Sequence, residues 1–269
     1  METGEPHRPV LYQEIIQYLA PFSPGRYLDC TAGAGGHSKG ILEASAPDGQ
    51  LVALDLDPDA VALARATLAP FGSRAIVKHA SYTESAQVLA EIGWQKVDGI
   101  VLDLGVSSMQ LDQAERGFSF QQNGPLDMRF DPTRGPSAAD LVNNLDEKAL
   151  ADLIWRYGEE RYSRKIARAI VQARPLHTTQ ELATVVRSAI GRTSERQDPA
   201  TRTFQALRIA VNDELKNIQE ALPQLIELLE PNARLAVISF HSLEDRIVKQ
   251  IFQRESKDCI CPPEQPICT

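Results

Sequence analysis

The sequence predicts an α/β fold, in which a mostly parallel sheet carries helices on both faces and holds an inserted helical region. Short apolar runs alternate with helical patterns through the first hundred residues, as in repeated β-α units. A fifth apolar run, residues 234–239, begins more than a hundred residues after Asp103, whereas a crossover needs little more than a dozen. We therefore expect an insertion between the fourth and fifth strands.

The individual elements follow from periodicity. The expected strands are 27–30, 51–54, 75–77, 97–102 and 234–239, with helices near 37–46, 58–69 and 83–92. In the insertion, apolar residues recur at helical spacing from Leu145 to Tyr157 and from Phe204 to Leu222. We expect the second stripe to be one long helix that begins near Pro199. Residues 109–136 are rich in Gly, Pro, Asp and Gln, and predict a long ordered loop.

Charge is distributed unevenly along the chain. The formal net charge is −8, yet residues 154–208 hold eleven Arg and Lys against five Asp and Glu. A basic segment on an acidic body indicates a local anionic partner. The chain contains no apolar run of membrane-spanning length, and its start lacks the pattern of a signal peptide. We therefore expect a cytoplasmic protein with no membrane partner.

The most informative stretch is YLDCTAGAGGHS, residues 27–38, followed by LVALDLD, residues 51–57. A strand, a glycine-rich turn, a helix and a second strand with a terminal acid form a nucleotide-binding unit. A nicotinamide site would favour a third glycine at Ser38 and has no need of Asp29 in the strand. The pattern Asp29-x-Thr-x-Gly-x-Gly-Gly is more similar to the first motif of S-adenosylmethionine-dependent methyltransferases.

Two further residues fit a cofactor site, each with a plainer alternative. Asp103 ends the fourth strand, at the carboxyl edge where open α/β sheets bind ligands, but an acid there also braces loops or caps helices. Tyr82 follows the third strand and could stack on an adenine, or be an ordinary aromatic at the rim. Sequence alone leaves both alternatives open.

Two clusters of side chains raise the question of further ligands. Arg161, Arg164, Lys165 and Arg168 recur at i, i+3, i+4 and i+7, which places four cations on one helix face. Such a face binds phosphates or is simply solvated. Three cysteines, Cys259, Cys261 and Cys268, form an incomplete zinc set near the end of the chain, and we expect no metal there.

Longer motifs make the resemblance specific. They are Asp103-Leu-Gly-Val-Ser-Ser108, Glu115-Arg-Gly-Phe-Ser-Phe120, Gly124-Pro-Leu-Asp-Met-Arg129, Pro199-Ala-Thr-Arg-Thr-Phe-Gln205, Ser239-Phe-His-Ser-Leu-Glu-Asp-Arg246 and the opening His7-x-Pro-Val-Leu11. From about His7 to Lys249 the chain resembles the bacterial 16S ribosomal RNA cytosine-N4 methyltransferases. The family's sequences continue beyond Thr269 into a basic segment that completes the sheet. We therefore expect this sequence to be part of a longer chain.

The resemblance implies a Rossmann-like class I methyltransferase that transfers a methyl group from S-adenosylmethionine to the N4 amino group of a 16S rRNA cytidine near the decoding centre. It implies a methyltransferase domain of residues 1–108 and 215–269, and a lid loop with a helical RNA-recognition domain at 109–214. The implied partner is 16S rRNA in the small ribosomal subunit. The sequence leaves open whether the protein is a monomer or a homodimer.

The resemblance implies a cofactor set, and position in the predicted fold adds catalytic and RNA-binding candidates. The cofactor-binding set is Gly33, Gly35, Gly36, His37, Asp55, Tyr82, Asp103 and Gln110. The candidate catalytic residues are Asp103, which would accept from the amino group or only hold the cofactor, and His241, which follows the fifth strand but could be structural. The RNA-binding set is Arg129, Arg161, Arg164, Lys165, Arg168 and Arg202.

Other functions remain as alternatives at this level. A related methyltransferase with a different acceptor and an assembly factor with little turnover both fit the same motifs. A nicotinamide-dependent oxidoreductase is disfavoured by Ser38 and Asp29. Cofactor identity and methyl incorporation into ribosomal RNA separate these alternatives.

Overall fold

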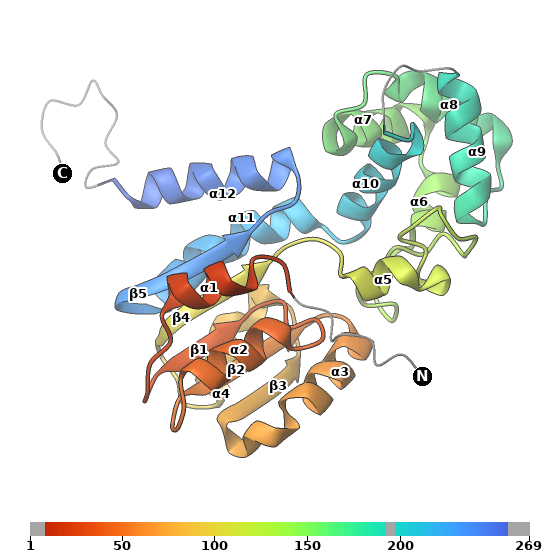
Figure 1. The fold of residues 1–269 in the computed structure, drawn as a ribbon. Helices are drawn as coiled ribbons and strands as arrows, with labels where there is room; N and C mark the ends of the chain where they lie inside the picture. Colours follow the sequence, from red (N-terminus) through yellow and green to blue (C-terminus); the bar gives the residue numbers. More distant parts are fainter. Residues whose placement is uncertain (1–8, 192–196, 258–269) are drawn as a thin grey trace, which may run out of the picture. The chain divides into compact units, whose positions relative to one another are not determined.

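The computed structural model describes residues 9–191 and 197–257. The chain divides into two compact units, which are described separately (Figure 1). The first, the sheet unit, is formed by Met1–Gly105 with Leu215–Thr269, and the second, the helical unit, by Val106–Glu214. The three tail cysteines lie outside the described residues.

The sheet unit contains five parallel strands in the order β3-β2-β1-β4-β5. They are β1 Arg26–Asp29, β2 Gln50–Asp55, β3 Ala75–His79, β4 Val97–Asp103 and β5 Leu229–Ile238. All five predicted strands are present, and β5 begins earlier than expected. β1 lies between β2 and β4, with Leu28 opposite both Val52 and Ile100. This arrangement confirms the predicted Rossmann-like fold class.

Helices cover both faces of the sheet (Figure 1). The helices whose side chains join one core are α1 Tyr12–Leu19, α2 Gly36–Ala44 and α3 Pro58–Leu68. Those that join the other core are α4 Ser85–Glu91, α11 Glu214–Glu227 and α12 Ser242–Glu255. Consecutive strand residues alternate between the cores, as Tyr27 and Leu28 do, so the strands are apolar on both sides. Short 3₁₀ helices are η1 Ala69–Arg74 and η2 Tyr82–Glu84.

The helical unit has a core of its own. Its elements are α5 Ser108–Asp112, η3 Ala114–Arg116, α6 Ala138–Asn144, α7 Glu147–Gly158, α8 Ser163–Ala173, α9 Thr179–Ile190 and α10 Ala200–Val211. Leu150, Ile154, Ile166 and Leu207 are fully buried together, which explains the helical periodicity of the insertion. Among the described residues, no helix is long and apolar enough to cross a membrane.

The prediction of one long helix after Pro199 is wrong. The segment divides into α10 and α11, because Asp213 adopts a left-handed backbone with φ 51°. The side chain of Asn212 explains the break. Its Oδ1 accepts from the N–H of Phe130 at 2.8 Å, and its Nδ2 donates to the carbonyl of Met128 at 2.7 Å. These two hydrogen bonds to a distant segment end the helix at Asn212, although the apolar period continues into α11.

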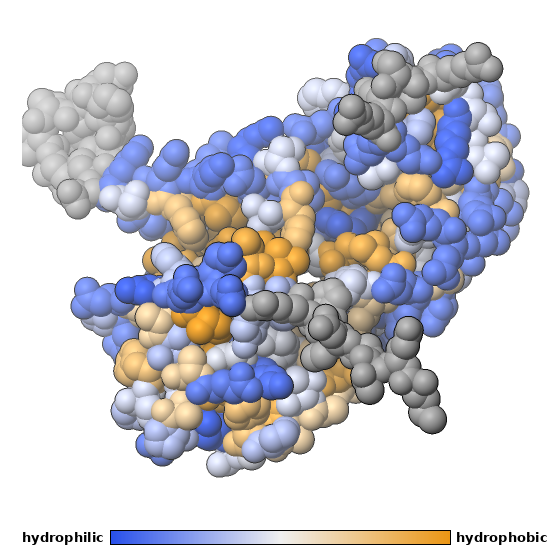
Figure 2. Space-filling view, viewed as in Figure 1, coloured by the Kyte–Doolittle hydropathy of each residue, from blue (hydrophilic) through white to orange (hydrophobic). Residues whose placement is uncertain are grey.

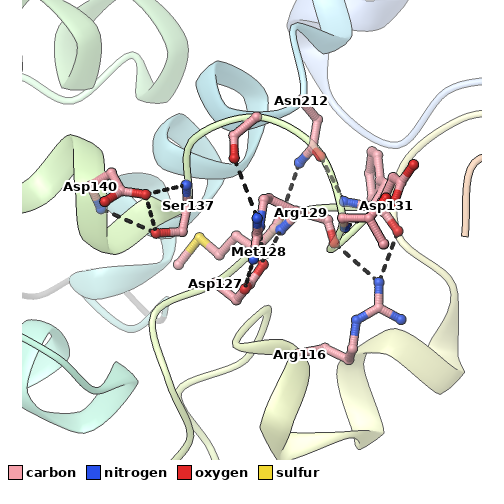
Figure 3. A network of polar contacts seen from close by, with 11 residues as sticks. Arg116, Asp127, Met128, Arg129, Asp131, Ser137, Asp140 and Asn212 are labelled. Carbon is pink, nitrogen blue, oxygen red and sulfur yellow. Dashed lines mark hydrogen bonds and ion pairs between the residues drawn. The ribbon is translucent and has the colours of Figure 1, made fainter.

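The loop at residues 109–136 is ordered by polar contacts, as Figure 3 shows. Arg116 is buried and donates to the carbonyls of Arg129 and Phe130 at 3.0 and 2.9 Å. Met128 is fully buried despite a left-handed backbone with φ 63°. Together with Asn212, these contacts satisfy the backbone of a segment that has little regular structure.

Candidate functional site

The turn between β1 and α2 is held open by two glycines. Gly33 and Gly35 have φ values of 52° and 85°, a region that side chains with a Cβ rarely adopt. A Cβ added at Gly33 would meet nothing within 4 Å, so open space lies in front of this turn. The N–H of Gly33 donates to Asp55 Oδ2 at 2.8 Å. This bond joins the two parts of the predicted nucleotide-binding unit.

Asp55 is the last residue of β2, and each of its carboxylate oxygens accepts a hydrogen bond from a backbone N–H. Its Oδ2 accepts from Gly33 and its Oδ1 accepts from the N–H of Asp57, both at 2.8 Å. Burial raises the pKa of Asp55 to about 6, and the two N–H donors oppose that shift. Each carboxylate oxygen has a second lone pair, which is what acceptance from a ribose hydroxyl requires.

Asp29 is fully buried inside the turn. Ser38 Oγ donates to Asp29 Oδ2 at 2.6 Å, and the N–H of Thr31 donates to Oδ1 at 3.1 Å. Burial raises the pKa of the Asp29 carboxyl, while the bond from Ser38 lowers it. The acid and the serine, which the sequence shows only as separate departures from a nicotinamide motif, therefore fasten α2 to β1.

Asp103 and His37 come together at the carboxyl edge of β1 and β4. The backbone N–H of Asp103 donates to Thr31 Oγ1 at 2.7 Å, which secures the end of β4 beside the turn. His37, in the first turn of α2, places its Nε2 3.6 Å from Asp103 Oδ2.

Three buried polar atoms at this point have no hydrogen-bond partner among the described residues. They are Nδ1 and Nε2 of His37 and Oδ1 of Asp103. Buried polar groups are nearly always paired, so orphaned atoms beside an open glycine turn fit a site that a polar ligand completes. The chemistry of the set, with two acids, an imidazole and turn N–H groups, suits a nucleoside that carries a cationic sulfur.

The two remaining cofactor candidates belong to different units. Tyr82 begins η2 and packs, partly buried, against the core on the α4 side. Gln110 belongs to the helical unit, where its Oε1 accepts from the N–H of Ser107 at 3.0 Å and caps α5. Both assignments stay predictions.

His241 has a structural role in this fold. It is the N-cap of α12, and its Nδ1 accepts from the N–H of Glu244 at 3.4 Å. Its Nε2 lies 3.1 Å from Oε1 of the buried Glu244. The cap accounts for a histidine here, and its catalytic assignment stays a prediction.

Comparison with known proteins identifies the family. The model of the MraW methylase family matches residues 4–269. This chain belongs to the MraW methylase family. The membership and the site together make the protein a methyltransferase, for which S-adenosylmethionine is the cofactor.

Curated relatives in the MraW family match this chain almost throughout. A protein of Dehalococcoides mccartyi named ribosomal RNA small subunit methyltransferase H is 54% identical over 99% of this chain and 76% of its own length. A protein of the same name from Thermomicrobium roseum is 52% identical over 97% of this chain and 81% of its own length. One from a Geobacter species is 54% identical over 97% of this chain and 86% of its own length.

In this MraW family member, the predicted cationic face is smaller than expected. Arg164, Lys165 and Arg168 lie on the exposed face of α8, and the surface over this helix is mostly hydrophilic in Figure 2. Arg168 pairs with Glu147 at 3.4 Å. Placing Arg161 on the same face was wrong, because the helix begins only at Ser163.

A turn before α8 explains the position of Arg161. Glu159 has a left-handed backbone with φ 49°, and Glu160 Oε1 accepts from the N–H of Tyr162 at 2.8 Å. The helix therefore starts late, and the Arg161 guanidinium lies 4.8 Å from the centre of the Tyr162 ring.

Arg129 and Arg202 are both held by carboxylates. Arg129 donates to both oxygens of Asp127, at 2.9 and 2.6 Å, and these bonds raise its pKa (Figure 3). Arg202 Nη1 lies 3.5 Å from Oε2 of Glu160, whose side chain is only 3% exposed. Each cation has a structural function, and its assignment to RNA stays a prediction.

Proposed function

We propose that this protein transfers a methyl group from S-adenosylmethionine to the N4 amino group of a cytidine in 16S ribosomal RNA, near the decoding centre. The names of its relatives and the motifs from Asp103 to Arg246 support the substrate class. The observation that carries the chemistry is the pair His37 and Asp103 beside the open glycine turn, with buried atoms that no described residue hydrogen-bonds. We expect the reaction to take place in the cytoplasm, where ribosomal RNA is found.

The cofactor pocket is assigned to the sheet unit. Backbone N–H groups of the turn at Gly33–Gly36 would face the polar parts of the ligand, and Asp55 would accept from its ribose hydroxyls. Tyr82 would flank the adenine, with Gln110 a further candidate for the cofactor. His37 and Asp103 would face the amino-acid and sulfonium end. S-adenosylmethionine supplies an electrophilic methyl group on a positively charged sulfur.

Asp103 is the candidate for activating the amino group. The N4 lone pair of cytosine is delocalised into the ring, so the nitrogen needs an acceptor for one of its hydrogens. Asp103 Oδ1 is buried and without a partner among the described residues, which leaves it able to accept one. In the transfer, N4 would bond to the methyl carbon as the carbon–sulfur bond breaks, so that the neutral thioether S-adenosylhomocysteine leaves. Asp103 would take the proton that N4 loses, and alignment of the reacting atoms in a dry site would add to the acceleration.

RNA recognition is assigned to residues 109–214, and cofactor binding to 1–108 with 215–269. Arg164, Lys165 and Arg168 offer exposed charge to phosphates, and Arg161 with Tyr162 joins a cation to an exposed ring. The target base must leave its stack to react. A single-stranded segment in the small ribosomal subunit is therefore the expected substrate.

Two assays test this proposal. Calorimetric titration with S-adenosylmethionine should show binding that Asp55→Ala abolishes or weakens strongly. Labelled methyl transfer should then go to small ribosomal subunits, and mass spectrometry should locate N4-methylcytidine in the 16S rRNA. Binding without transfer to RNA would refute the substrate, and no binding to the native chain would refute the pocket.

A further inference from the structure

The N-terminal segment Pro9–Tyr12 packs against the cofactor turn through two glycines of α2. A Cβ at Gly36 would lie 2.3 Å from Cγ of Pro9, and a Cβ at Gly40 would lie 2.5 Å from Oη of Tyr12. Gly36 and Gly40 are four residues apart, so they share one helix face. Because neither glycine has a side chain, Pro9 and Tyr12 fill the space beside them on this face of α2.

Tyr12 reaches the His37 imidazole from this position. The two rings are stacked, with centroids 6.3 Å apart and an interplanar angle of 19°. His37 is 5% exposed, and neither ring nitrogen has a hydrogen-bond partner among the described residues. Because the outer torsion of a histidine is broad, the orientation of this imidazole depends on the groups packed against it as well as on the nearby Asp103 carboxylate. The Tyr12 ring is an aromatic surface that packs against it.

We propose that Tyr12 is a positioning residue that holds the His37 imidazole with Nε2 toward the Asp103 carboxylate. The 3.6 Å separation of His37 and Asp103 then depends on this aromatic contact. This inference rests on the proposed function, in which His37 and Asp103 face the cofactor. Tyr12 does not touch the reacting atoms and acts through His37.

A double-mutant cycle tests this dependence. Tyr12→Phe keeps the ring and should bind S-adenosylmethionine within twofold of the native affinity. Tyr12→Leu removes the aromatic surface and should weaken binding by roughly 2- to 10-fold, the range of an aromatic pair. In a His37→Ala background the same leucine should have no further effect. An equal loss in both backgrounds would show that Tyr12 only supports the fold, and would overturn the inference.

A second readout needs neither cofactor nor RNA, so it distinguishes this inference from the proposed function. Imidazole nitrogen signals of His37 in cofactor-free protein should be sharp for the native chain and Tyr12→Phe, and broadened or shifted for Tyr12→Leu. Tyr18→Leu is the matched control, since Tyr18 lies on the same helix and its ring is exposed. Identical His37 signals in native protein and Tyr12→Leu would refute the positioning role, whether or not the chain methylates RNA.

Discussion

His37 Nε2 lies 3.6 Å from Asp103 Oδ2, and no hydrogen bond from another described residue restrains either imidazole nitrogen. This separation is slightly longer than a hydrogen bond. The pair stands beside Asp29, which is fully buried and interacts electrostatically with both residues. Two carboxyl groups therefore lie at the edge of the sheet where we propose that the sulfonium binds.

Replacing Asp103 with asparagine tests its role as proton acceptor. An amide cannot take the proton, so the rate of methyl transfer should fall by about 10²- to 10⁴-fold. Calorimetric affinity for S-adenosylmethionine should change much less. Asp98→Asn is the control, because Asp98 lies at the other end of β4 and accepts from the N–H of Arg26. A rate near the native one in Asp103→Asn would leave Asp103 only a cofactor-holding role.

The raised pKa of Asp55 predicts pH-dependent cofactor binding. Burial raises this pKa to about 6, and the ionised carboxylate is the better acceptor for ribose hydroxyls. Affinity should be constant above pH 7 and weaken below pH 6, by at most about tenfold per pH unit. Titration calorimetry across this range measures the effect. Asp55→Asn should bind weakly with no such dependence, and an unchanged profile in that variant would contradict the assignment.

The raised pKa of Asp55 also predicts how the stability of the fold changes with pH. Because the folded pKa lies above the ordinary value, protonated Asp55 stabilises the fold at low pH. This contribution is lost as pH rises through about 6. Chemical unfolding of native protein and Asp55→Asn between pH 5 and pH 8 would measure the difference between their two profiles.

Charge reversal on α8 tests RNA recognition. Arg164→Glu with Lys165→Glu should weaken binding to small-subunit RNA by about tenfold or more and reduce the salt slope by roughly 0.7 for each lost phosphate contact. Cofactor affinity should not change. The matched control is Lys216→Glu with Lys249→Glu, which makes the same charge change on exposed helices of the sheet unit. RNA binding unaffected by the α8 reversal would exclude this face.

Removing the Arg202 cation tests its structural function. Arg202→Met leaves the buried Glu160 carboxylate without this partner, which should lower the free energy of unfolding by about 1–3 kcal/mol in urea titrations. In the Glu160→Gln background the same change should cost less. A stable Arg202→Met variant with weakened RNA binding would instead favour a direct contact with RNA.

Local pattern was sufficient for much of this molecule. The strands, the glycine turn and the positions of Asp55 and Asp103 at strand ends were predictable, because apolar periodicity and turn chemistry involve residues close in sequence. The roles of the two acids stay predictions. The start of α10 near Pro199 was predictable for the same reason. Family motifs then supplied the enzyme class, which no periodicity contains.

Two helix boundaries could not be predicted, because contacts outside the apolar pattern set them. The helix breaks after Asn212 because its amide serves the loop at Met128–Phe130, and a period in apolar residues carries no trace of that demand. The turn at Glu159–Glu160 likewise removes Arg161 from the face that its spacing predicts.

The sequence by itself therefore determined the sheet, the glycine turn and the family of this protein. Only the tertiary structure decided which histidine caps a helix, as His241 does at the start of α12, and which lies beside the glycine turn near an acid, as His37 does near Asp103. The reason is physical. Backbone propensity acts between neighbours in the chain, whereas burial and hydrogen bonding depend on groups that only folding brings together.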